Sequence, residues 1–228
     1  MTMYQAPFPT AFNATLSKSA EQQISPPHRS ATSVFKRFLD IIGSLVGLSI
    51  LALVYVPVAI AIKLDSPGPV MYSQERYGLQ GRTFKIRKFR SMVVNAEALK
   101  DQVQNEASGF IFKSKTDPRV TRVGRILRST SLDELPQFWN VLVGEMSLVG
   151  TRPPTGDEVA LYNERHWKRL KVKPGLTGEW QVNGRSSIKD FEEIVNLDLR
   201  YQSQWHPLYD IFVILKTIYV LVARVGAF

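Results

Sequence analysis

The amino-acid sequence predicts a mainly helical α+β protein with one membrane-associated helix near its N-terminus. The first observation is an uncharged apolar segment from Ile41 to Ile62. The second is a pair of short strand patterns, followed by helical patterns that loops rich in Gly and Pro separate. The third is a formal net charge of +9 over 228 residues, which favours an anionic partner: nucleic acid, anionic lipid or a phosphorylated substrate.

Composition excludes several kinds of chemistry. The sequence has no cysteine, so disulfides, thiolate metal sites and cysteine nucleophiles are excluded. The three histidines lie far apart along the chain, and we interpret them as surface or packing residues. Residues 1–33 are rich in Ser, Thr, Gln, Ala and Pro, which predicts a disordered or loosely held tail.

Residues 34–63 are predicted to form the membrane helix. Roughly twenty apolar residues are enough to cross a bilayer, so a simple spanning helix is one interpretation. Pro57 lies inside the apolar segment and removes one backbone donor, which favours a bend. Basic residues flank both ends of the segment, and positively charged flanks prefer the cytoplasmic side. A helix bent at Pro57 that re-enters the same face satisfies both observations, and the residues alone leave the two interpretations open.

Residues 64–228 are predicted to form one domain with its own core. Residues 70–76 and 83–89 have the pattern of two strands joined by a short loop. Residues 92–106 have helical spacing, and a further helix is predicted to start at residues 116–118. In that helix an arginine recurs every third residue beside apolar positions, which is typical of a helix on an anionic membrane surface or of a solvated charged face. These arginines are Arg119, Arg122, Arg125 and Arg128.

The segment Ser131-Leu132-Asp133-Glu134-Leu135-Pro136-Gln137 contains two adjacent carboxylates at a predicted helix start. Ser131 and Glu134 have the spacing of a capping box, so the acidic pair could be a helix cap. Two Gly- and Pro-rich segments follow, residues 144–154 with Arg152 and residues 173–185 with Arg185. A guanidinium can bind phosphate with a planar fork of donors, and Mg²⁺ bridges phosphates with only one or two carboxylates. This combination indicates a site for a metal-bound diphosphate.

The sequence resembles the bacterial sugar transferases, the monotopic polyprenyl-phosphate phosphoglycosyl transferases. The similarity extends from about Val34 to the C-terminus, in one order of motifs and with the family's spacing. The segments that carry it are Lys88 to Met92, Ser131 to Gln137, Met146 to Pro154 and Lys173 to Arg185.

The resemblance implies a covalent mechanism. Asp133 would attack the diphosphate of a UDP-sugar, form an aspartyl-phosphosugar and release UMP, and polyprenyl (undecaprenyl) phosphate would then accept the sugar phosphate. Glu134 would hold Mg²⁺. Phosphate binding would fall to Arg152 with Pro153, and to Lys88, Arg90 and Arg185. The C-terminal residues 226–228 resemble the hexose-transferring branch, which favours UDP-glucose or UDP-galactose as the donor.

The resemblance also implies the architecture. The helix would re-enter at Pro57, and residues 64–228 would form a cytoplasmic catalytic domain. Its amphipathic interfacial helices would surround an active site on the cytoplasmic face of the bacterial inner membrane. The chain resembles the minimal form of the family. Residues 211–228 are apolar but interrupted by Lys216 and Arg224, so we expect them to lie in the interface or to pack on the membrane helix. Thr151 stands where the family commonly has proline, which is expected to loosen that loop.

Two other functions fit the composition. A non-enzymatic protein could bind anionic lipid or nucleic acid through its basic surface, although no nucleic-acid motif is present and nucleic acid is not expected as a partner. A glycosyl transferase that moves the sugar without its phosphate would release UDP instead of UMP. The expected partners are a UDP-sugar, polyprenyl phosphate and anionic membrane lipid, with homo-oligomerisation left open.

Overall fold

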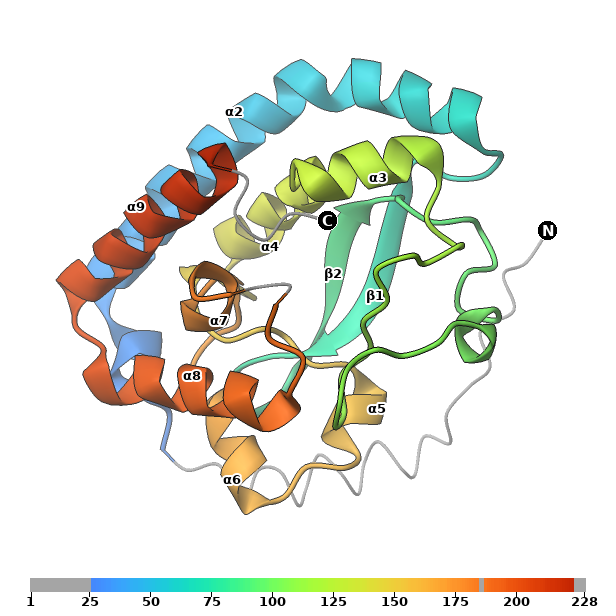
Figure 1. Ribbon diagram of the computed structural model, residues 1–228. Coiled ribbons are helices and arrows are strands. Elements are labelled where there is room, and N and C mark those ends of the chain that lie inside the picture. The colour runs from blue at the N-terminus through green and yellow to red at the C-terminus, as the bar shows by residue number, and fades with distance from the viewer. Residues whose placement is uncertain (1–25, 185–186, 224–228) are drawn as a thin grey trace.

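The computed structural model describes residues 26–184 and 187–223, and it is mainly helical, with two short two-stranded sheets (Figure 1). This confirms the predicted fold class in outline. The elements follow one another along the chain as helices (α), 3₁₀ helices (η) and strands (β): η1 (Arg29–Thr32), α2 (Val34–Asp65), β1 (Met71–Tyr77), η2 (Leu79–Gly81), β2 (Thr83–Phe89), η3 (Lys100–Gln102), α3 (Arg122–Ser129), η4 (Leu132–Gln137), α4 (Phe138–Val143), β3 (Ser147–Val149), α5 (Gly156–Val159), α6 (Glu164–Trp167), η5 (Lys168–Lys171), β4 (Gly175–Thr177), α7 (Glu179–Val182), α8 (Phe191–Gln204) and α9 (Pro207–Val222).

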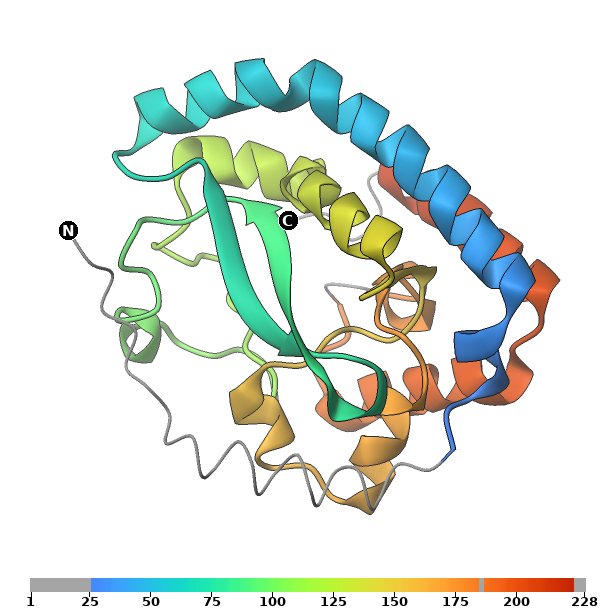
Figure 2. The same cartoon turned by 180° about the vertical axis from the view of Figure 1, so that it is seen from behind.

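Helix α2 is long, apolar and largely exposed. The Ser33 side chain caps its first turn by accepting from the Lys36 amide at 3.3 Å, and the helix continues through Pro57. Figure 2 shows α2 as an arc around one side of the molecule, with α9 beside its first half. Within the described residues, α2 is the single helix long and apolar enough to cross a membrane. Pro57 has no backbone N–H, so the Leu53 carbonyl lacks its usual helical donor. The nearby Ser49 hydroxyl donates to the Leu45 carbonyl at 2.9 Å instead.

The first turns of α2 are tied to the rest of the protein by buried polar groups. Lys36 donates to the Val149 carbonyl at 2.8 Å and pairs with Asp210 of α9 at 2.9 Å. One turn further on, the Asp40 carboxylate accepts from the Ser147 hydroxyl and the Leu148 amide, both at 2.8 Å. These contacts place strand β3 directly against α2. Because Asp210 is on α9, the ion pair also brings the first turn of α9 against α2.

The other end of α2 contacts the hairpin and α3. Ile62 packs in one cluster with Phe89 of β2 and Leu127 of α3. The Asp65 carboxylate accepts from the Val123 amide at 2.9 Å at the start of α3. In the middle of α2, close packing requires small residues: a Cβ on Gly47 would lie 2.3 Å from the Phe138 ring. Both ends of this helix therefore contact the same folded body.

The predicted hairpin is confirmed with small shifts in its bounds. Strands β1 and β2 pair antiparallel, and Tyr72 lies opposite Lys88 while Arg76 lies opposite Phe84. Because residues directly opposite each other point to the same side of a sheet, Arg76 and Lys88 share one face. That face also carries Phe84 and Ile86, which pack on Val141 and Met146.

The predicted helix over residues 92–106 is wrong. This segment forms turns and the single 3₁₀ turn η3. Its start is held by tertiary pairing instead: Met92 forms an isolated bridge with Val120, and the Val93 amide donates to the Arg119 carbonyl at 2.9 Å. Near its end the Asn105 side chain accepts from the Lys113 amide at 2.9 Å. Long-range backbone bonds therefore override the local helical spacing.

The predicted helix start at residues 116–118 is also wrong, because α3 begins at Arg122. Thr121 is its cap, and its hydroxyl accepts from the Gly124 amide at 3.0 Å. Asp117 instead forms a buried ion pair with Arg119 at 2.8 Å. Of the four arginines in the predicted basic face, only Arg122 and Arg125 are exposed, and Arg128 donates to the Ser91 hydroxyl at 3.0 Å.

Residues 26–33, within the predicted tail, include η1 and contact the folded body. The His28 amide donates to the Lys171 carbonyl at 2.8 Å, and Arg29 donates to the Trp205 carbonyl at 2.6 Å. The first 25 residues of the predicted tail lie outside the described residues.

Candidate active site

The Asp133-Glu134 pair lies on η4, directly after a left-handed turn. Ser131 has φ 57° and makes no side-chain capping bond, so the predicted capping box is wrong. A left-handed conformation costs a non-glycine residue of order 1–3 kcal/mol and is concentrated at functional sites. Asp133 is 7% exposed. Two side-chain groups near Asp133 in the sequence are buried and have no hydrogen-bond partner within the described part of the chain: the Ser131 hydroxyl and the Gln137 amide nitrogen. Unpartnered polar groups therefore lie at both ends of η4.

Glu134 is held by the hairpin. The Lys88 ammonium lies 2.7 Å from the Glu134 carboxylate, and both side chains are about one-third exposed or less (27% and 31%). The neighbouring carboxylate, Asp133, is much more deeply buried. The two adjacent acids therefore lie in different surroundings, and a cation already touches the more accessible one.

A second group of charged side chains lies further along the same hairpin face. Arg76 donates to the Pro153 carbonyl at 3.0 Å. It is four residues along β1 from Tyr72, which lies opposite Lys88, so the backbones of Arg76 and Lys88 are about 13 Å apart along the strands. Burial and then the charge of Arg152 lower the pKa of the Arg76 guanidinium to about 10, while Glu158 works in the opposite direction. One face of the hairpin thus connects the acidic pair with a basic group.

Arg152 is the centre of that basic group. One of its nitrogens contacts both carboxylate oxygens of Glu158, at 2.8 and 3.0 Å. Glu158 is 5% exposed. Burial opposes its ionisation, but Arg152, Arg76 and Arg169 together hold the pKa of the Glu158 carboxyl below its usual value. The Arg152 guanidinium also lies over the Trp180 ring, 6.0 Å from its centre. Its orientation is therefore set by one carboxylate and one indole.

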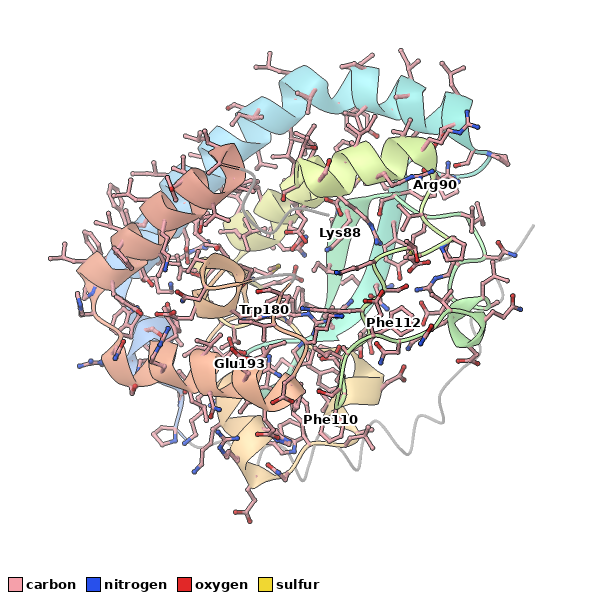
Figure 3. The ribbon with its side chains drawn as sticks, in the orientation of Figure 1. Lys88, Arg90, Phe110, Phe112, Trp180 and Glu193 are labelled. Carbon is pink, nitrogen blue, oxygen red and sulfur yellow. The ribbon has the colours of Figure 1, made fainter. Side chains whose placement is uncertain are left out.

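Lys113 lies over the same indole. Its ammonium is 5.0 Å from the centre of the Trp180 ring, and it donates to the Ile188 carbonyl. Burial, and then the positive charges of Arg152 and Lys189, lower the pKa of this ammonium to about 8. Figure 3 labels Lys88 on β2, Trp180 on α7 and Phe112 on the segment before α3, and these elements border the same side of the hairpin.

Of the other predicted phosphate-binding residues, one lies elsewhere, one is in the basic group and one lies outside the described residues. Arg90 is buried and donates to the carbonyls of Pro67 and, at 2.8 Å, Ser66, at the end of α2. Pro153 is in the basic group through its carbonyl. Arg185 lies outside the described residues. The structure therefore brings together Lys88, Glu134 and Asp133 at one end of the hairpin face, and Arg152 and Pro153 at the other.

Thr151, at the departure from the family pattern, is held firmly. It is buried, and its hydroxyl donates to the Arg169 carbonyl at 3.3 Å. Its own carbonyl accepts from the Gly175 amide at 2.9 Å. The expected loosening of this loop is therefore offset by a side-chain bond that proline could not make.

The donor set suits a magnesium ion held largely by phosphate. In residues 26–184 and 187–223, no group of three or more His, Cys, Asp or Glu side chains gathers into an all-protein metal site. Mg²⁺ usually uses one or two carboxylates and completes its shell with waters and substrate phosphates. Glu134, partly exposed beside the buried Asp133, fits that requirement.

Sequence reasoning missed Arg76, Lys113, Glu158 and Trp180 as parts of the site. Arg76 could have been found from the hairpin register, because it shares a face with Lys88. Lys113 lies in an irregular segment, and no periodicity marks it. Asp198 and Asp210 are both buried ion-pair partners: Asp198 pairs with Arg169, and Asp210 pairs with Lys36.

Comparisons with known proteins identify the family of this chain. The family model described as "Bacterial sugar transferase" matches residues 31–224. The chain is 50% identical over 196 residues to a protein named galactosyl transferase CpsE from Streptococcus agalactiae, covering 85% of this chain and 43% of the relative. It is 40% identical over 200 residues to a UDP-glucose:undecaprenyl-phosphate glucose-1-phosphate transferase from Escherichia coli, covering 85% and 41%.

A shorter relative is covered almost completely. The exopolysaccharide production protein ExoY of Rhizobium meliloti is 34% identical over 216 residues, which are 88% of this chain and 95% of that protein. The chain spans less than half the length of the first two relatives. The residues that the family model matches include the long apolar helix α2, the acidic pair after Ser131 and the loop that carries Arg152. The chain belongs to the bacterial sugar transferase family.

Proposed function

We propose that this protein transfers a hexose 1-phosphate from a UDP-sugar to undecaprenyl phosphate, as the first membrane step in the synthesis of a polysaccharide or related glycoconjugate. The observation that carries the proposal is the buried Asp133, beside a Lys88-bound Glu134, on the hairpin face that also carries the Arg152 group. Relatives named for glucose-1-phosphate transfer, galactosyl transfer and exopolysaccharide production support a hexose donor.

The reaction is proposed to take two displacements at one phosphorus atom. The Asp133 carboxylate attacks the phosphorus that bears the sugar, and the bond to the bridging oxygen breaks, so UMP leaves with that oxygen and its electron pair. A phosphate oxygen of undecaprenyl phosphate then attacks the same phosphorus, and the Asp133 carboxylate leaves unchanged. Both nucleophiles are anions, so cations must screen the phosphate oxygens.

The chain's own cations are proposed to do this screening. At one end of the site lies the Lys88 ammonium, paired with the Glu134 carboxylate. At the other end Arg152 holds phosphate, and Glu158 and Trp180 orient its guanidinium. Lys88 and Arg185 stay candidates for phosphate contact, whereas Arg90 is buried and bonded to backbone carbonyls at the end of α2. Mg²⁺ held by Glu134 would supply further charge neutralisation of the diphosphate.

The membrane helix is proposed to re-enter the cytoplasmic face of the inner membrane. Its first turns contact β3 and α9, and its last turn contacts the hairpin and α3. A straight helix of this length would separate its ends by about 48 Å. Contacts of both ends with one body support a curved helix whose exposed middle enters the lipid. Exposed apolar side chains on α9, among them Phe212, Leu215 and Ile218, support an interfacial position for that helix.

Single cysteines test re-entry cleanly, because the sequence has none. We expect Thr32→Cys before α2 and Ala160→Cys after α5 to react with an impermeant maleimide from the same side of membrane vesicles. Leu53→Cys, in the exposed middle of α2, should react only after detergent is added. Pro57→Ala restores a backbone donor, and it should increase the fraction of Thr32→Cys that is labelled from the other side. Labelling of Thr32→Cys and Ala160→Cys from opposite sides would show a spanning helix.

The catalytic proposal is tested by intact mass measurement. Purified protein in nanodiscs is incubated with Mg²⁺ and UDP-glucose or UDP-galactose, without lipid acceptor. The expected product is a hexose-phosphate adduct on Asp133, with release of UMP, that disappears when undecaprenyl phosphate is added. Release of UDP without an adduct would indicate direct sugar transfer, and binding without turnover would indicate a non-enzymatic surface protein.

A further inference from the structure

Two cations share one aromatic ring in the basic group. The Lys113 ammonium lies 5.0 Å, and the Arg152 guanidinium 6.0 Å, from the centre of the Trp180 ring. The three residues come from different parts of the chain: the segment before α3, the loop after β3 and the short helix α7. An aromatic face attracts a cation, so the indole stabilises both. The arrangement brings together positive groups that would otherwise repel.

The charged groups around Lys113 leave this region positive. Among the described residues, Arg152 and Lys189 act on its ammonium, and both are positive. Their carboxylate partners are Glu158, at 2.8 Å from Arg152, and Glu106, at 3.0 Å from Lys189. The Glu158 carboxylate also interacts with the positive charge of Arg76, so it cannot fully neutralise Arg152 alone. The described cations of this group therefore outnumber its carboxylates.

Arg152 has donors left for a ligand. Glu158 contacts a single nitrogen of its guanidinium, and a guanidinium has five N–H donors in a planar fork. Lys113 adds a compact ammonium on a flexible stem, which suits a second phosphoryl oxygen. A mobile surface lysine would not be anchored in this way: the Lys113 ammonium is half-buried, bonded to the Ile188 carbonyl and seated on Trp180.

We propose that Lys113 is a phosphate-binding residue, and that Lys113 and Arg152 together hold the diphosphate of the nucleotide sugar beside the Trp180 ring. The inference rests on the proposed function for the identity of the ligand. A diphosphate has two adjacent phosphoryl groups, so it can contact both cations at once and relieve their repulsion.

Kinetics of three variants test this assignment. Lys113→Met keeps an apolar stem on Trp180 but removes the charge, and we expect it to raise KM for the UDP-sugar by about 10- to 100-fold. We expect kcat to change much less, and Lys113→Arg to restore most of the loss. Lys115→Ala is the matched control, because Lys115 lies two residues away in the same segment and is exposed. A KM for Lys113→Met equal to that of the Lys115→Ala control would overturn the assignment.

Calorimetric titration with UDP and Mg²⁺ separates this inference from the proposed chemistry, because it requires no covalent step. In the wild-type protein, UDP affinity should fall as the pH rises through about 8, since the Lys113 ammonium loses its proton there. Lys113→Arg should remove this loss of affinity. If the wild-type protein forms the adduct but Lys113→Met binds UDP as tightly as wild type, the inference fails and the proposed function stands. If UDP binding weakens in Lys113→Met and no adduct forms in wild type, the inference stands and the covalent mechanism fails.

Discussion

Asp133→Asn should reduce sugar-phosphate transfer at least about a thousandfold, the order of loss seen when a covalent nucleophile is removed. The substitution keeps the size of the side chain and removes the charge that must attack phosphorus. The buried position of Asp133 means that no neighbouring residue of η4 can replace it without rearranging the turn after Ser131. The measurement is UMP release per unit time, together with intact mass for the hexose-phosphate adduct.

The matched control is Asp157→Asn, an exposed aspartate on α5 whose ion pair with Lys100 lies at the surface. It should transfer sugar phosphate at the wild-type rate. Thermal unfolding of Asp133→Asn should stay close to that of wild type, which would separate lost chemistry from lost structure. Turnover of Asp133→Asn within tenfold of wild type would remove Asp133 from the proposed mechanism.

Asp198→Ala should produce the largest loss of stability, about 3–5 kcal/mol, because it leaves the Arg169 guanidinium buried without its ion-pair partner. The two side chains are 1% and 2% exposed and their charged groups lie 2.7 Å apart. Burial raises the pKa of the Asp198 carboxyl, while Arg169 works in the opposite direction. For a domain of this size the expected fall in Tm is roughly 6–20 °C, measured by thermal unfolding in a fixed detergent.

Two comparisons make this prediction specific. Asp157→Ala breaks the exposed pair with Lys100, and it should cost less than about 1 kcal/mol. The double variant Arg169→Met/Asp198→Leu removes both charges, so it should recover much of the stability that Asp198→Ala loses. A Tm for Asp198→Ala equal to that of Asp157→Ala would show that the buried pair contributes little.

The buried pairs also explain how distant parts of the chain are positioned. Lys36 at the start of α2 and Asp210 on α9 are far apart in sequence, and they meet beside Val149 at the end of β3. The same strand leads into the loop that carries Arg152. The apolar helix α2, helix α9 and the loop that carries Arg152 are therefore tied to one buried polar group.

Local features could be predicted from the sequence by itself. The uncharged segment from Ile41 to Ile62 predicts an apolar helix, because about twenty apolar residues in a row are typical of a helix in contact with lipid. Alternating residues predict the hairpin, since side chains on a strand have a period of two. The order of the motifs indicates the family and points to Asp133 and Arg152 before any contact is known.

Other features were decided by tertiary structure. Residues 92–106 have helical spacing but bond instead to the backbone near Arg119, because those long-range bonds replace the helical ones. Arg119 itself leaves the predicted basic face to pair with Asp117. The neighbourhood of Lys113, Arg152 and Trp180 depends on three separate segments meeting. Spacing along the chain determines local periodicity, whereas a contact between distant charges is determined only when folding excludes water around them and each must find a partner.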